Sequence, residues 1–364
     1  MKMALKGIGI LTAGGDCPGL NAVIRAVTKT AIHDYGIEVF GIQDGFEGPI
    51  EKRGHRLTSE DVSGILTHGG TILGTSNTSN PFKMALKSGP AGKFVDRSAQ
   101  VLKNFKAWNL QALIAVGGDG TLKIARKLLE MGMPVVGIPK TIDNDLSGTD
   151  LTFGFDSAVT IATDALDRLH TTAASHHRVM ILEVMGRHAG WIALYSGAAG
   201  GADVILIPEI PFTVASVSAA VKKRHDSGKK FSLMVVAEGA FEKGAKPQVQ
   251  RLDKKNPYPE KLGGIGNYLM NEIEHKTGIE TRVAVLGHIQ RGGSPTPFDR
   301  NLGTLFGKHA VELVVRKQWG TMVSLQGQHI GSVPIAEAVS VLKTIPLDHA
   351  LISAARSVGT EFGE

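Results

Sequence analysis

Short apolar runs alternate along most of the chain with segments that have helical periodicity. The apolar runs are rich in Val, Ile and Leu without alternating polar positions, which predicts parallel strands covered on both faces. These predicted strands are Gly7–Ala13, Glu38–Ile42, Ala112–Val116, Val135–Ile138, Val179–Val184, Val204–Ile207, Leu233–Ala237 and Arg282–Leu286. In residues 156–170 and 214–224, apolar side chains recur every three or four positions, as on one face of a helix. The alternation predicts a doubly wound α/β architecture in two lobes.

Composition narrows the possible functions. The net charge is +6, but aromatic residues make up only 5% and do not interleave with the basic ones. A nucleic-acid surface therefore has little support, and anionic small substrates are favoured. No apolar run reaches the roughly 18 residues of a membrane span. The single cysteine, Cys17, cannot form a disulfide within the chain, so we expect a cytoplasmic protein.

Two glycine-rich turns follow predicted strands and precede predicted helices. Residues 14–21 read Gly-Gly-Asp-Cys-Pro-Gly-Leu-Asn, and residues 117–121 read Gly-Gly-Asp-Gly-Thr. Glycines let the backbone approach a ligand closely, and a helix N-terminus offers unpaired N–H groups to an anion. The turns predict one nucleotide site, in which Asp119 is a candidate Mg²⁺ ligand because hard cations prefer oxygen. A structural turn is the alternative, and the second turn also resembles loops of NAD kinases and diacylglycerol kinases.

The run Pro-Lys-Thr-Ile-Asp-Asn-Asp at residues 139–145 follows another predicted strand. Phosphoryl transfer to an alcohol needs an acceptor for the hydroxyl proton and groups that hold the phosphate oxygens. Asp143 can be the base, and Asp145 can reach the same cleft. Thr141 can bond a phosphoryl oxygen, and Lys140 can neutralise one. In isolation, both carboxylates are equally well explained as turn residues that bind their own backbone.

Cationic side chains gather near the ends of further predicted strands. They are Arg178, Arg187, Arg282, His288 and Arg291. Arginine binds phosphate through two parallel hydrogen bonds, so the set suits a sugar phosphate. Glu238 follows another strand and could accept hydrogen bonds from sugar hydroxyls. A surface ion pair explains any one of these arginines as well as a ligand does, and only the set favours a ligand.

With these motifs in order, the chain resembles the 6-phosphofructokinases from about Gly7 to about Leu325. The resemblance rests on TAGGDCPGLNAVIRAV, GGTILGTSN, AVGGDGTL, PKTIDND, EVMGRHAGWIAL, AEGA and LGHIQRGGSP. It implies the two-lobed phosphofructokinase fold. It also implies phosphorylation of fructose 6-phosphate at the 1-hydroxyl with ATP and Mg²⁺, the committed step of glycolysis.

The resemblance also implies a role for each motif residue. Asp143 would take the hydroxyl proton with Asp145 and Arg187 assisting, and Thr141 would contact the transferred phosphoryl group. The 6-phosphate would be held by Arg282, His288 and Arg291, and the sugar lined by Met185, Gly186, Arg187 and Glu238. The donor would be surrounded by Gly15, Phe46, Asn77, Thr78, Gly118, Asp119, Gly120, Thr121 and Lys140, with Asp119 binding Mg²⁺. A homo-oligomer, dimer or tetramer, is implied, because Arg178 and Arg282 stand where family members reach a neighbouring subunit's site.

Several positions depart from the best-known bacterial ATP enzymes and bear on the donor. Those enzymes carry an arginine where this chain has Asn77, and an aromatic hydroxyl where it has Phe46. Lys140 is typical of pyrophosphate-dependent members, which usually carry aspartate at the position of Gly120. Such an aspartate blocks the α-phosphate of a nucleotide, so Gly120 favours ATP. The alternative is a reversible, pyrophosphate-dependent enzyme.

The expected division of the chain follows from the motifs. We expect a donor lobe at residues 1–155, completed by part of 295–330, and a fructose 6-phosphate lobe at 156–294. Residues 241–262 are polar and rich in Lys and Pro, which predicts a surface insertion. Residues 331–364 would be a C-terminal extension that packs on the lobes. A remote alternative, a non-catalytic sugar-phosphate sensor, would be expected to have lost a carboxylate such as Asp143.

Overall fold

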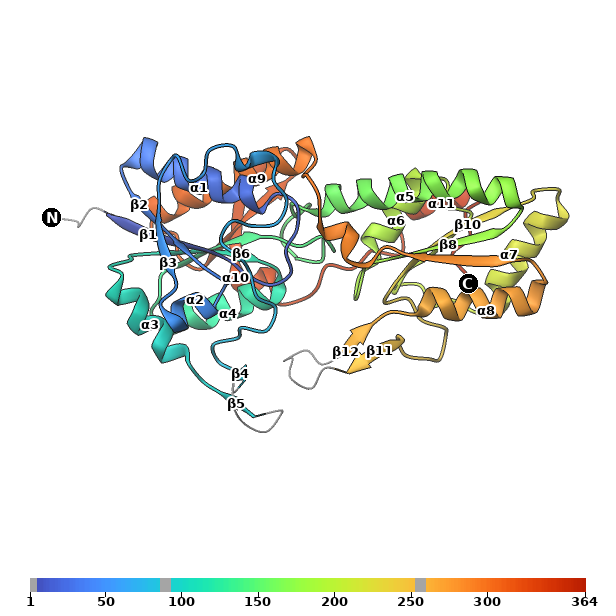
Figure 1. Ribbon diagram of the computed structural model, residues 1–364, viewed down its shortest axis with the longest axis horizontal. Helices are drawn as coiled ribbons and strands as arrows, with labels where there is room; N and C mark the ends of the chain where they lie inside the picture. The colour runs from blue at the N-terminus through green and yellow to red at the C-terminus, as the bar shows by residue number, and fades with distance from the viewer. Residues whose placement is uncertain (1–4, 86–92, 253–259) are drawn as a thin grey trace.

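The computed structural model describes residues 5–85, 93–252 and 260–364, which form two lobes side by side (Figure 1). The first lobe contains a seven-stranded sheet with the order β15-β14-β7-β6-β1-β2-β3. Its parallel strands are β1 (Gly7–Thr12), β2 (Glu38–Ile42), β6 (Leu113–Gly117), β7 (Val135–Pro139) and β14 (Thr321–Gln326). The edge strands β3 (Gly54–Leu57) and β15 (His329–Pro334) are antiparallel to their neighbours.

Helices cover both faces of the first sheet. Ile8 and Ile10 of β1 pack in a core with α1 (Leu20–Tyr35) and α9 (Pro297–Val315). Leu11, on the opposite face of the strand, packs in a second core with α3 (Ser98–Ala107) and α4 (Asp119–Glu130). Burial on both faces explains why the strand is apolar at successive positions.

The second lobe repeats this arrangement on a smaller sheet. Its parallel strands have the order β13-β8-β10-β9, with bounds β8 (Val179–Val184), β9 (Val204–Leu206), β10 (Ser232–Ala237) and β13 (Thr281–Val285). Leu182 of β8 faces the core shared with α5 (Phe155–His176) and α6 (Trp191–Ala199), whereas Ile181 faces α7 (Val214–Asp226) and α8 (Ile265–Thr277). The predicted α/β fold with mostly parallel sheets and flanking helices is confirmed.

The remaining elements are short. They are α2 (Glu47–Glu51), β4 (Met84–Ala85), β5 (Phe94–Val95), β11 (Val249–Leu252), β12 (Glu260–Leu262), α10 (Ile335–Ala338), α11 (Ala350–Ser357) and the 3₁₀ turns η1 (Ile65–Thr67) and η2 (Gly287–Arg291). The predicted insertion at 241–262 contains the antiparallel pair β11–β12. Its residues 253–259, like residues 1–4 and 86–92 of the predicted donor lobe, lie outside the described residues. No helix among the described residues is both long and apolar enough to cross a membrane.

The described chain passes between the lobes at three places: between β7 and α5, between η2 and α9, and between α10 and α11. These crossings bring the loops after β1, β6 and β7 of the first lobe close to the loops after β8, β10 and β13 of the second (Figure 1). The predicted boundary between residues 330 and 331 cuts β15, which pairs with β14 in the first sheet. We therefore propose that the first lobe continues through α10.

Candidate active site between the two lobes

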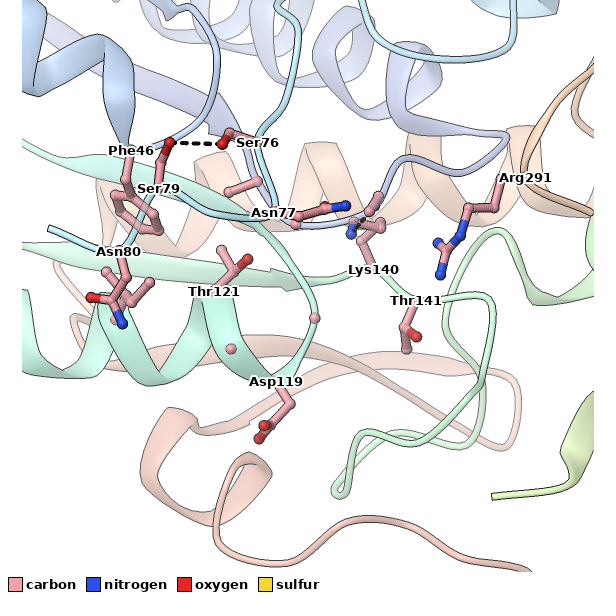
Figure 2. A pocket seen from close by; sticks show the side chains of 16 residues that line it. Phe46, Ser76, Asn77, Ser79, Asn80, Asp119, Thr121, Lys140, Thr141 and Arg291 are labelled. Carbon is pink, nitrogen blue, oxygen red and sulfur yellow. Dashed lines mark hydrogen bonds between the residues drawn. The ribbon is translucent and has the colours of Figure 1, made fainter. Parts of the chain in front are cut away.

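A cavity of about 270 Å³ lies at the carboxyl ends of β1, β6 and β7, where open α/β sheets bind ligands. Figure 2 shows the side chains around it. Eight of the nine residues predicted to surround the donor line it: Gly15, Phe46, Asn77, Gly118, Asp119, Gly120, Thr121 and Lys140. Thr141 and Arg291 line it as well. The two glycine turns thus meet in one site.

The N-terminus of α4 forms one wall of this cavity. Gly118 precedes the helix and provides no side-chain cap, so the first N–H groups of the helix are left for a ligand. Thr121 is buried beside them. On the opposite wall the backbone of Gly15 comes close to Arg291, so that a Cβ atom there would lie 2.7 Å from a guanidinium nitrogen and the arginine would have to move. The N-terminus of α4 and the backbone at Gly15 together can hold an anion between them.

Lys140 joins the loops from two strands. Its ammonium group donates a hydrogen bond to the carbonyl oxygen of Gly15, and the residue is only 3% exposed. Burial lowers the pKa of Lys140 to about 8. The ammonium group of Lys140 is therefore held against the glycine-rich turn that follows β1.

Thr78 is the exception among the predicted donor residues. It does not line the cavity; its backbone N–H donates to Ser76 Oγ at 3.3 Å and its carbonyl oxygen accepts from Asn80. Ser76, Ser79 and Asn80 do line the cavity and were missed as donor residues. The dashed line in Figure 2 marks the 2.7 Å bond between Ser79 and Ser76. Ser76 belongs to the motif GGTILGTSN, which signalled the segment but not which of its side chains faces the cavity.

Asp143 lies two residues beyond Thr141, next to the cavity. Its Oδ1 atom is buried without a hydrogen-bond partner, and its backbone N–H donates to Thr141 Oγ1 at 3.1 Å. Burial, followed by the charge of Asp145, raises the pKa of Asp143 to about 7, against the effect of the surrounding cations. An unpartnered carboxylate with such a pKa is suited to accept a proton near neutral pH.

The second lobe contributes charged side chains around Asp143. Arg187 follows β8, and Glu238 follows β10. Burial, and then the charge of Asp143, raises the pKa of Glu238 to about 7, while Arg291 and Arg187 oppose this effect. The sequence-predicted residues Asp143, Arg187, Glu238 and Arg291 are therefore electrostatic neighbours, drawn from both lobes.

The loop that carries Arg187 is fixed by hydrogen bonds. The backbone N–H of Met185 donates to Gln290 Oε1 at 3.2 Å, and Gly186 accepts from the N–H of Gly239 at 3.1 Å. Gly186 has a φ of 139°, which favours glycine. His288 lies in η2 and is exposed. These residues lie on the side of the cleft that the second lobe provides, where the sugar phosphate is predicted to bind.

Arg291 lies at the boundary of the donor and acceptor sides. It was expected at the 6-phosphate end, yet one of its guanidinium nitrogens donates to the carbonyl oxygen of Asp16 at 3.0 Å. It lines the donor cavity together with Lys140 and Thr141 (Figure 2). In this conformation its charge faces the cavity.

Arg178 and Arg282 lie at the amino-terminal ends of strands in the second sheet, away from the site. Arg178 immediately precedes β8, and Arg282 is the second residue of β13, whereas the site lies beyond the carboxyl ends of these strands. Six residues of strand span about 20 Å. Both arginines contact Glu280, with Arg178 Nε at 2.6 Å from its carboxylate. The structure therefore does not bring this pair to the cleft of its own chain.

Asp119 and Asp145 are the carboxylates available to a divalent cation. Asp119 Oδ2 pairs with Lys123 at 2.8 Å, while its Oδ1 is buried without a partner. Burial raises the pKa of Asp145, and the charge of Asp119 adds to that effect. No group of three or more His, Cys, Asp or Glu side chains in the described ranges is arranged to hold a metal. Mg²⁺ bound to nucleotides is often held by one or two carboxylates, substrate phosphates and water, which these oxygens fit.

Comparison with protein families and curated proteins gives consistent matches. A family model described as Phosphofructokinase matches residues 7–314. An ATP-dependent 6-phosphofructokinase 3 from Bacteroides thetaiotaomicron is 51% identical over 356 residues, which cover 98% of this chain and 99% of that protein. A pyrophosphate–fructose 6-phosphate 1-phosphotransferase from Amycolatopsis mediterranei is 51% identical over 342 residues, or 94% of this chain and 96% of that protein.

Solved structures share the fold. The phosphofructokinase of Pichia pastoris in the T-state is 32% identical, with a TM-score of 0.78 over 93% of this chain. This chain covers only 36% of that longer protein. A pyrophosphate-dependent phosphofructokinase from Nitrosospira multiformis has a TM-score of 0.80 at 21% identity, over 99% of this chain and 93% of that one. At that identity the likeness concerns the fold alone.

Proposed function

The chain belongs to the phosphofructokinase family, and we propose that it transfers the γ-phosphoryl group of ATP to the 1-hydroxyl of fructose 6-phosphate. One observation carries the proposal. The buried, unpartnered Oδ1 of Asp143 lies between the donor cavity and the charged side chains of the second lobe. A general base for an acceptor hydroxyl belongs in that place.

The reaction follows from the positions of the side chains. The 1-hydroxyl oxygen forms a bond to the γ-phosphorus, while the bond from that phosphorus to the β–γ bridging oxygen breaks and ADP leaves. The hydroxyl proton goes to Asp143. Lys140, Arg291 and the N-terminus of α4 stabilise the charge on the transferred group and on the leaving phosphate. Thr141 donates to a phosphoryl oxygen.

A divalent cation is part of this proposal. When bound, Mg²⁺ neutralises charge on the β- and γ-phosphates. Asp119 would hold it, with Asp145 nearby, because Asp119 lines the cavity, one of its oxygens has no other partner, and its charge acts on Asp145. The neighbouring His188 has a pKa lowered by burial and by Arg187, which favours a neutral ring beside this site.

The shape of the site favours ATP over pyrophosphate. A second cavity of about 380 Å³ adjoins the first and shares Asn80, Gly120 and Ile124 with it. Pyrophosphate would need only the first cavity, whereas the second offers room for a nucleoside. Gly120 stands where the two cavities meet, and its hydrogen side chain leaves the passage open. Lys140 remains the observation in favour of a pyrophosphate-dependent enzyme, since it binds phosphate oxygens of either donor.

The acceptor site would be completed by a second copy of the chain. Arg178 and Arg282 point to this arrangement because they lie at the opposite end of the strands from Asp143. In a homo-oligomer whose subunits meet along the β13 edge, they could reach the 6-phosphate bound by a neighbouring subunit. Dimer and tetramer both satisfy this requirement.

Initial rates test the proposal. Purified protein is assayed with fructose 6-phosphate and either ATP or pyrophosphate, with and without Mg²⁺. We expect turnover with ATP, dependence on Mg²⁺, and fructose 1,6-bisphosphate as product. A protein that ignores ATP and turns over with pyrophosphate would establish the alternative, and inactivity with both donors would reject the function.

A further inference from the structure

The side chain of Lys343 reaches from the C-terminal segment into the loop that carries the two catalytic carboxylates. Its ammonium group donates to Asn144 Oδ1 at 3.0 Å and to the carbonyl oxygens of Thr149 and Asp150 at 2.9 and 2.8 Å. These three bonds use all the donors of an ammonium group. None of the three acceptors is a carboxylate, so the contact depends on how the loop is folded and not on a single opposite charge.

Asn144 is the residue that this contact fixes. It lies between Asp143 and Asp145, is 2% exposed and has a φ of 50°, a left-handed conformation that non-glycine residues seldom adopt. Its Oδ1 also accepts from the backbone N–H of Thr152 at 3.1 Å. Because Asn144 lies between Asp143 and Asp145, a change in its φ would turn the backbone that carries both carboxylates.

The backbone around Lys343 also attaches the loop to the second lobe. The N–H of Lys343 donates to the carbonyl oxygen of Asp145 at 2.9 Å, and its own carbonyl accepts from Trp191 Nε1 at 3.0 Å. Trp191 begins α6, directly after the loop that carries Arg187. Two residues on, the N–H of Ile345 donates to Glu209, which also accepts from the N–H of Gly190. The segment from Lys343 to Ile345 therefore contacts both the loop that carries Asp143 and Asp145 and the start of α6, next to the loop that carries Arg187.

An ammonium group in this position costs stability. Burial lowers the pKa of Lys343 to about 8, which means that the charged form is disfavoured there. The Trp191 ring centroid lies 5.5 Å from Nζ and offsets part of this cost through a cation–π contact. If this segment only held the two lobes together, an apolar residue at position 343 could do so at a lower cost in stability.

We propose that Lys343 is a positioning residue for the transfer reaction, holding Asp143 at the distance and angle from the sugar that proton abstraction requires. The proposal rests on the proposed function, because it concerns how the base is aligned with the acceptor. Misplacement of a reacting group by about 1 Å costs on the order of 100-fold in rate. Loss of Lys343 is therefore expected to lower kcat without weakening the binding of either substrate.

The test compares Lys343→Met with the control Lys223→Met, which removes a lysine whose side chain is 82% exposed. We expect kcat of Lys343→Met to fall about 100-fold, with both KM values within about threefold of wild type. Lys223→Met should match wild type. A kcat within about threefold of wild type for Lys343→Met would overturn the proposal.

Chemical rescue separates alignment from a loss of folding. Lys343→Cys alkylated with bromoethylamine regains an ammonium group on a side chain of similar length. The natural cysteine should not react, because Cys17 is fully buried and burial raises its pKa to about 12. Recovery of at least tenfold in kcat supports the proposal, and the treated wild type is the control. Alkylation at position 343, confirmed by mass, without any recovery would contradict it.

Amide hydrogen exchange tests the same contact without substrates. Residues 143–152 should exchange about tenfold faster in Lys343→Met than in wild type, with exchange in α4 unchanged. Unchanged exchange in the loop would overturn the proposal even if activity fell. Because this measurement needs no turnover, a wild type inactive with fructose 6-phosphate and ATP would reject the proposed function while leaving the loop contact measurable.

Discussion

The two sides of the cleft are built differently. The donor side consists largely of backbone and small side chains, with Gly15, Gly118 and the N-terminus of α4 around a cavity that one chain encloses. The acceptor side consists of long charged side chains, and two of its predicted cations, Arg178 and Arg282, lie at the far end of the second sheet. Under the proposed function, one chain would form a complete donor site but an incomplete acceptor site.

This difference separates two kinds of specificity. A backbone cradle binds any polyphosphate, and on our proposal the donor is selected by the room left at one position, Gly120. Charged side chains recognise a particular sugar phosphate, and they can come from a second subunit. The electrostatic neighbours of Asp143 come from both sides, and on our proposal both substrates depend on it.

The largest effect is expected from Asp143→Asn. Removing the base should lower kcat by about 10³- to 10⁴-fold while fructose 6-phosphate still binds. The raised pKa of Asp143 means that its ionised form opposes folding, so above pH 7 the variant should also have a higher Tm. Single-turnover kinetics and thermal unfolding at pH 8 measure both effects. Equal loss of binding and turnover would argue against a general base.

A smaller effect is expected from Gly120→Asp, which adds bulk and charge where the two cavities meet. We expect kcat/KM for ATP to fall about 100-fold, because a carboxylate repels the α-phosphate, and activity with pyrophosphate to fall far less. Gly120→Ala is the matched control for bulk without charge. If ATP and pyrophosphate use fell equally, the passage would not select the donor.

Arg282→Ala addresses the acceptor side. The KM for fructose 6-phosphate should rise about 10- to 100-fold with little change in the KM for ATP, as expected when a charged hydrogen bond to a phosphate is lost. Arg168→Ala removes an exposed arginine that pairs with Asp164 and should leave both values unchanged. An unaltered KM for fructose 6-phosphate in Arg282→Ala would mean that Arg282 contacts Glu280 but does not bind the substrate.

The smallest effect concerns pH. Asp143 must be ionised to accept a proton, and its pKa is raised to about 7. Activity should therefore be full above this value, and kcat/KM should fall as pH decreases, approaching tenfold per unit below pH 6. Rates measured from pH 5.5 to 9 with a fixed Mg²⁺ concentration would show this decrease in kcat/KM at low pH. A rate that is flat down to pH 5.5 would contradict the pKa that burial gives Asp143.

Much of the fold was predictable because burial on both sheet faces produces uninterrupted apolar runs. The predicted strands Glu38–Ile42 and Val179–Val184 coincide with β2 and β8. The edge strands β3 and β15 were not predicted, since GHRL and HIGSVP are partly exposed and carry no such run. The helix predicted at 156–170 is longer in the structure, where α5 runs to His176. The prediction stopped short because the last residues of α5 are small or polar and show no apolar periodicity.

The candidate site could be predicted as far as local motifs extend. The turns after β1, β6 and β7 supply many of the residues that line the cavity, because parallel strands bring such turns to one edge, whereas Phe46 and Asn77 were expected only from the family resemblance. The contact of Arg291 with Asp16 and that of Lys343 with Asn144 could not be predicted, since each depends on a crossing between lobes. Sequence spacing carries no signal for partners 275 or 199 residues apart.

Mixing two impaired variants, assayed at a fructose 6-phosphate concentration well below the raised KM of Arg282→Ala, tests most directly whether two chains make one acceptor site. Asp143→Asn and Arg282→Ala are dissociated together and allowed to reassemble. If Arg282 acts across a subunit boundary, random pairing in dimers regenerates an intact site at about a quarter of positions, so about a quarter of wild-type activity should return. Activity no greater than the sum of the separate variants, in mixed oligomers verified by mass, would contradict the shared acceptor site.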